Sequence, residues 1–142
     1  MKKAKDLIIP FIVSLIIVMI WEIPAIIASR SSGMPGQPAI VSLMIILLLP
    51  VAPVIYGWIT RDQVGALIIG IIPMFLLGLI IPVVSGDFPG GRWVITGIIY
   101  WGILMVIAGL AGYSAAKKEL KYLVVSVILT GVWFAVFVSG LN

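Results

Sequence analysis

The chain has 142 residues, of which 63% are hydrophobic and 10% are charged, and it contains no cysteine and no histidine. Soluble domains average roughly 45–50% apolar and about 25% charged residues, so the composition indicates a single integral membrane domain, residues 1–142. The missing residue types exclude disulfide frameworks, thiolate or imidazole metal sites and serine–histidine or cysteine–histidine catalysis. We expect no enzymatic activity, no cofactor and no metal.

Five long apolar runs follow one another along the chain, separated by short polar links. They cover residues 7–29, 39–59, 64–84, 93–113 and 122–141. Each is close to the ~20 residues that a helix needs to cross ~30 Å of hydrocarbon, and a helix satisfies its own backbone hydrogen bonds in lipid. Because short links join antiparallel neighbours, the sequence predicts an all-α membrane protein, an up–down bundle of five transmembrane helices.

Basic residues are distributed unevenly between the two sets of links. One set holds Lys2, Lys3, Lys5, Arg61, Lys117, Lys118 and Lys121, and the other holds only Arg30 and Arg92. The positive-inside rule therefore predicts a cytoplasmic N-terminus and an outside C-terminus. We expect a multi-pass protein of a prokaryotic plasma membrane. Its partners are the lipid bilayer, including anionic headgroups, and other membrane chains or a second copy, but not nucleic acid.

The first apolar run resembles a secretory signal in one respect only. The start MKKAKD fits a basic n-region. The apolar stretch that follows is long for an h-region, and no well-spaced small–x–small cleavage site ends it. We therefore expect a retained first helix.

Two pairs of short motifs suggest an internal repeat. IIPF at 8–11 matches IIPM at 71–74, and SGMPG at 32–36 matches SGDFPG at 85–90. These pairs predict a duplicated hairpin, runs one and two repeated as runs three and four, with the fifth run added. Chance recurrence in so biased a composition is the alternative.

Proline interrupts the first three runs. We expect Pro24, Pro50 and Pro73 to kink their helices, since proline removes a backbone hydrogen bond. Pro50 and Pro73 fall near the predicted bilayer midplane. Paired interruptions at that depth can mark a transport site, or they can simply shape the bundle.

The last two runs carry small residues at helix-packing spacing. Ala108 and Gly112 form one pair, and Gly131, Ala135 and Ser139 form a longer series. Helices in lipid gain packing energy where small residues let their backbones approach closely. We expect these faces to join helices within the chain, with self-association as the alternative.

Glu22 is the one acidic residue well inside an apolar run. It lies roughly 9 Å below the predicted outer boundary. Tyr100, Trp101 and Trp133 fall at a similar depth, and Trp21 precedes Glu22. A carboxylate in hydrocarbon is costly unless it finds partners, and indole and phenol groups need acceptors. The sequence thus predicts a small outward-facing cavity that binds a ligand through these five residues, with Arg30 and Arg92 as counter-charges.

Two other interpretations of Glu22 remain open. Trp21 and Glu22 can mark the outer interface of a shorter first span, with the indole in the aromatic belt. Alternatively, Glu22 can be a hydrogen-bond acceptor that locks the bundle.

Two further local features carry expectations. Arg61 and Asp62 predict an ion pair that caps the third span, and Ser14 and Ser42 are expected to bond back to their own helices.

The scarcity of polar groups limits the function classes. The leading hypothesis is a non-catalytic subunit or accessory of a larger membrane assembly. The alternative is a component of a small-molecule or ion transporter or channel that uses Glu22 as its coupling carboxylate. A lipid-modifying enzyme is disfavoured, because such enzymes need several acidic residues, a metal or histidine.

Overall fold

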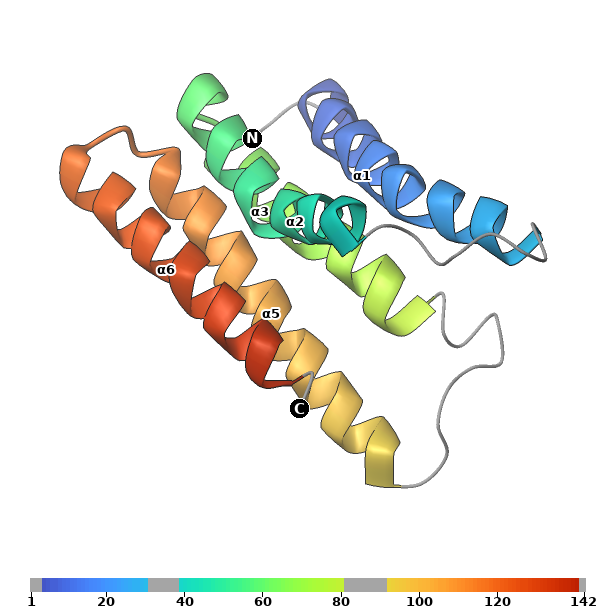
Figure 1. The fold of residues 1–142 in the computed structure, drawn as a ribbon. Coiled ribbons are helices and arrows are strands. Elements are labelled where there is room, and N and C mark those ends of the chain that lie inside the picture. Colours follow the sequence, from blue (N-terminus) through green and yellow to red (C-terminus); the bar gives the residue numbers. More distant parts are fainter. Residues whose placement is uncertain (1–3, 31–38, 81–91, 141–142) are drawn as a thin grey trace.

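The computed structural model describes residues 4–30, 39–80 and 92–140, and these residues form five α-helices and no strand (Figure 1). The helices are α1 Ala4–Arg30, α2 Ala39–Thr60, α3 Gln63–Phe75, α5 Arg92–Ala115 and α6 Leu120–Ser139, and a π-helical turn, η1 Leu76–Ile80, continues α3. Each predicted run therefore holds one helix. The remainder of the third run and both loops of the predicted hairpin repeat lie outside the described residues.

Three helices are long and apolar enough to cross a membrane. Their apolar segments are Asp6–Ile23, Ile95–Ala115 and Leu120–Ser139, and no more than 28% of the residues in any one of them is buried within the protein. The described apolar parts of the other two helices are shorter. Large hydrophobic side chains such as Ile9 and Val127 lie 60% and 62% exposed. Apolar surface on this scale does not persist in water, and a membrane protein is the class that the fold supports.

The helices form one bundle in which consecutive helices along the chain alternate in direction, so that the spatial neighbours α1 and α3 run parallel (Figure 1). Helices α1, α3, α5 and α6 lie side by side in that order, and α2 packs against both α3 and α5 (Figure 1). The most extensive contact is between α3 and α5, whereas α1 touches α2 only slightly. Helix α5 is thus the centre of the bundle, because it contacts α2, α3 and α6.

The core is built from side chains of every helix. Its buried members are Ile17, Leu49, Ile69, Met74, Leu77, Leu104, Ala108, Trp133 and Phe137. At the α3–α5 contact the two backbones touch: a Cβ on Gly70 would lie 2.6 Å from the Gly109 amide nitrogen. A Cβ on Gly112 would lie 2.7 Å from the Pro53 Cβ of α2. Small residues therefore permit the close approach of three helices at α5.

Proline affects α2 and α3 in different ways. Pro50, Pro53 and Pro73 are all buried. Helix α2 is continuous through both of its prolines but changes direction along its length in Figure 1. Pro73 has no N–H, and just beyond it the Leu76 amide is shared between the carbonyls of Ile72 and Pro73. The backbone then widens into η1.

Local polar groups end or brace the helices as expected from their residue types. Asp62 is the N-cap of α3, and one carboxylate oxygen accepts a 2.8 Å hydrogen bond from the Gly65 amide. The capping part of the prediction for Asp62 is confirmed. Ser14 donates to the Pro10 carbonyl at 2.9 Å, as predicted. The Ser42 side chain lies outside the described part of the chain.

Candidate functional site

Tyr100 links α5 to α6 by a hydrogen bond, at the end of the two helices that is opposite to the turn joining them. Its hydroxyl donates a 2.9 Å hydrogen bond to the Phe137 carbonyl. Its ring meets the neighbouring Trp101 edge to face, with centroids 6.0 Å apart and planes at 78°. The Trp101 ring covers Gly78 in η1 so closely that a side chain at Gly78 would overlap it. The two predicted aromatics of α5 thus reach two different neighbouring elements.

Trp133 lies at the centre of an aromatic cluster on α6. Its side chain is fully buried. It stacks on Phe137 at 5.1 Å with planes 6° apart, and it meets Phe134 edge to face at 5.2 Å. The indole nitrogen has no hydrogen-bond partner among the described residues. A buried N–H without an acceptor costs free energy, so an additional hydrogen-bond acceptor at this nitrogen would be stabilising.

Glu22 and Trp21 lie on α1, which packs against α3 and weakly against α2. Both side chains are half-buried, and Trp21 packs against the core. No hydrogen bond or ion pair joins Glu22 to another residue that the structure describes. The side chains of Pro24, Arg30 and Arg92 lie outside the described residues, so the predicted counter-charges are not placed. Tyr100 of α5 bonds to α6, which carries Trp133, whereas Trp101 covers Gly78 of η1 and Glu22 lies on α1.

The predicted packing residues separate into two groups. Ala108 and Gly112 are buried on α5, where they face α3 and α2. Gly131, Ala135 and Ser139 are exposed along the outer face of α6, and a Cβ built on Gly131 would meet nothing within 4 Å. Small residues four positions apart are therefore buried between helices on α5 but exposed on the surface of the bundle on α6.

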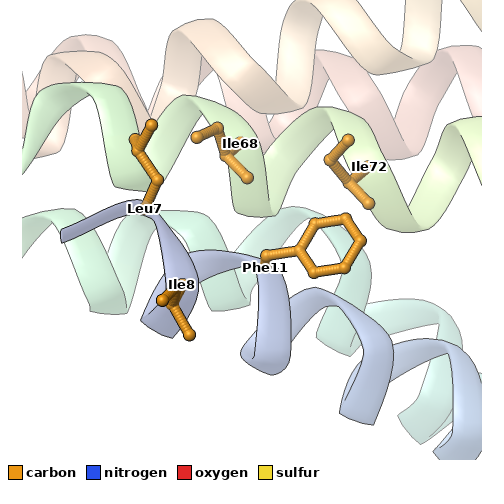
Figure 2. Close-up of a pocket in the computed structure, with 5 residues that line it drawn as sticks. All are labelled: Leu7, Ile8, Phe11, Ile68 and Ile72. Carbon is orange, nitrogen blue, oxygen red and sulfur yellow. The ribbon is translucent and has the colours of Figure 1, made fainter. Parts of the chain in front are cut away.

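An apolar pocket lies between α1 and α3. Leu7, Ile8 and Phe11 of α1 and Ile68 and Ile72 of α3 line it, and its volume is about 330 Å³ (Figure 2). The pocket is open to the surroundings, and its lining presents hydrocarbon and no side-chain hydrogen-bonding group. It can hold a lipid chain or another apolar group. Sequence reasoning did not predict this pocket, because apolar residues occur throughout every helix; Ile8, Phe11 and Ile72 drew notice only as parts of the repeated IIPF and IIPM motifs.

Acidic residues do not gather in the bundle. Within the described segments, no three Asp or Glu side chains come close enough to hold a metal ion. The arrangement provides a half-buried carboxylate, an unsatisfied indole and an apolar pocket, which lie on different helices.

Comparison with known proteins gives no match: no family model, no curated protein sequence and no solved structure is similar to this chain.

Proposed function

We propose that the chain is a small membrane protein of five spans that serves as a non-catalytic subunit or accessory of a larger membrane assembly. We further propose that the chain lies in the plasma membrane of a prokaryote, with its N-terminus in the cytoplasm and its C-terminus outside. The basic residues at one end of the bundle support that orientation. The two helices with shorter described apolar segments, α2 and α3, would complete the five spans.

The observation that carries the proposal is the outer face of α6. This helix packs on α5 and slightly on α2, and its opposite face is left uncovered. Gly131, Ala135 and Ser139 are exposed on that face, and a Cβ on Gly131 would meet nothing within 4 Å. In lipid there is no hydrophobic driving force to cover an apolar helix, because the lipid tails are themselves apolar. A face of small residues therefore adds packing energy only when another helix approaches it closely. A helix of a partner chain is the occupant that this face suits.

The test is purification of the whole chain from its native membrane in a mild detergent, with mass spectrometry of the proteins that co-elute. Stoichiometric partner chains are expected with the wild type. Gly131→Leu and Ala135→Leu should reduce their recovery, because the larger side chain keeps a facing backbone at a distance. Gly102→Leu is the matched control, since a Cβ on Gly102 also meets nothing within 4 Å. A lone chain with no stoichiometric partner contradicts the proposal.

A second candidate function rests on Glu22. A half-buried carboxylate on a membrane-crossing helix is costly and is by default a functional group. In this alternative, Glu22 couples proton or ion movement to transport. Glu22→Gln in reconstituted vesicles should then abolish uptake without loss of the fold, whereas Glu119→Gln, at an exposed turn, should not. Full activity of Glu22→Gln contradicts this alternative.

A further inference from the structure

Two short turns lie together at one end of the bundle. One, at Arg61 and Asp62, links α2 to α3, and the other, residues 116–119, links α5 to α6. Gly57 brings them together, because a Cβ there would lie 2.5 Å from the Gly112 carbonyl oxygen and 3.2 Å from the Ala116 nitrogen. The last turn of α2 thus rests on the backbone at the end of α5. We call the surface of these two turns the basic end.

Each of the two turns holds one non-glycine residue in the left-handed backbone region. These residues are Arg61, with φ of 59°, and Lys118, with φ of 54°. Glycine adopts this conformation without steric cost, and asparagine adopts it more readily than residues with long side chains. A long basic side chain occupies the position in both turns. Strained positions of this kind are found where a side chain has a function to perform.

Aromatic rings hold the lysines of the second turn in place. The Lys117 ammonium lies 4.1 Å from the Tyr122 ring centroid and 5.3 Å from that of Tyr113. The Lys118 ammonium lies 6.0 Å from the Trp58 ring centroid at the end of α2. A cation over a ring face is attracted to it and still has N–H donors free for another acceptor. The rings therefore orient the two charges without neutralising them.

The acidic side chains of the basic end are already engaged. Asp62 caps α3 through the Gly65 amide at 2.8 Å. Glu119 forms a 2.8 Å ion pair with Lys121. Lys117 and Lys118 form no ion pair with any residue in the described segments. The two lysine charges, with Arg61 in the neighbouring turn, are left for a ligand at the point where apolar helices meet the polar boundary.

We infer that the basic end binds the phosphodiester headgroup of an anionic phospholipid. Lys117 and Lys118 supply the contacts to the phosphate oxygens, and Arg61 adds positive charge. Trp58, Tyr113 and Tyr122 occupy the headgroup level, where amphipathic rings are favoured. The exposed apolar surface of the helices continues toward the acyl chains of the same lipid. This inference does not depend on the proposed assembly function, since the ligand is a lipid of the bilayer and not a partner chain.

The test compares two lipids of equal acyl chains, phosphatidylglycerol and phosphatidylcholine, offered together to the full-length protein in a non-ionic detergent. Native mass spectrometry gives the ratio of the two bound lipids. The wild type should prefer phosphatidylglycerol. Lys117→Gln/Lys118→Gln should lower that preference by about 25-fold, since each lysine near an anionic surface is worth about fivefold in affinity. Arg30→Gln/Arg92→Gln removes the same charge from the last residue of α1 and the first residue of α5, at the other end of the bundle, and should leave the preference within about twofold.

A second variant separates lipid binding from folding. Lys118→Gly should leave the thermal unfolding temperature unchanged or raise it, because glycine adopts a positive φ readily. It should still lower the lipid preference by about fivefold. The proposal is overturned if both double variants lose the preference equally, or if the turn variants retain it. It is also overturned if inorganic phosphate in excess displaces the lipid completely, because the site would then recognise free phosphate and not a headgroup.

Discussion

Gly70 of α3 lies directly against Gly109 of α5, so that the backbones of the two helices are in contact at the centre of the bundle. The position tolerates no side chain, because a Cβ on Gly70 would lie 2.6 Å from the Gly109 nitrogen and 2.7 Å from the Ala108 carbonyl carbon. These are backbone atoms, which cannot move aside without separating the helices.

Gly70→Ala should therefore destabilise the protein by about 1–3 kcal/mol, the usual cost of overpacking a core. The measurement is thermal unfolding in detergent, followed by circular dichroism. Gly102→Ala is the control, since its Cβ would enter open space, and it should gain up to about 1 kcal/mol of helix propensity. Equal stability of the two variants would contradict the close α3–α5 contact.

Tyr100→Phe removes the hydrogen bond from the Tyr100 hydroxyl to the Phe137 carbonyl and keeps the ring. The expected loss is about 0.5–1.5 kcal/mol in the free energy of unfolding. The matched control is Tyr113→Phe, because the Tyr113 ring meets Lys117 but its hydroxyl makes no hydrogen bond with a described residue. If both variants unfold at the wild-type temperature, the α5–α6 bond contributes nothing in the membrane-like environment.

Trp133 permits a test for an unseen acceptor. Trp133→Phe removes the unsatisfied indole N–H and leaves a small void, two effects that offset each other, so the unfolding free energy should change by less than about 1 kcal/mol. Trp133→Ala should cost about 3–5 kcal/mol, because the stacked cluster with Phe137 is lost. A Trp133→Phe variant as unstable as Trp133→Ala would show that the N–H has a partner, such as a bound ligand.

Asp62→Ala removes the N-cap of α3 and should destabilise the protein by about 0.5–2 kcal/mol. Asp62→Asn should retain most of the stability, because asparagine also caps helices well. The comparison variant is Glu119→Ala at the N-cap of α6, whose side chain makes no capping bond. Its cost should not exceed about 1 kcal/mol, the value of an exposed ion pair. A larger cost at Glu119 than at Asp62 would argue against the capping role.

The helix positions were predictable because the signals are local. Charged and turn-forming residues interrupt the apolar runs, and four of the described helices begin and end within a few residues of the predicted limits. In the third run the α-helix begins as predicted but ends at Phe75, after Pro73, and continues as η1 to Ile80. The capping role of Asp62 followed from its place just before an apolar run. The hydrogen bond from Ser14 to the Pro10 carbonyl was predictable because serine hydroxyls within helices commonly donate to the carbonyl four residues earlier.

The candidate site was less predictable because it depends on contacts between distant residues. Antiparallel neighbours bring equal depths together, and the Tyr100 hydroxyl of α5 accordingly reaches Phe137 of α6. Trp101, at the same depth, lies against Gly78 of η1 instead. Depth does not say which way a side chain faces. Glu22 shares the predicted depth but lies on α1, which packs chiefly against α3.

Composition and local order by themselves determined that this is an all-helical membrane protein. They also indicated where the apolar runs lie, because hydrocarbon thickness sets the length of an apolar helix and charged residues are costly within it. Only the tertiary structure decided which faces meet. Helices that are apolar on all sides carry no polar stripe to distinguish inside from outside. The decisive contacts are therefore those of close backbone approach. They bury Ala108 and Gly112 and leave Gly131 and Ala135 on the surface, although the two pairs share one spacing.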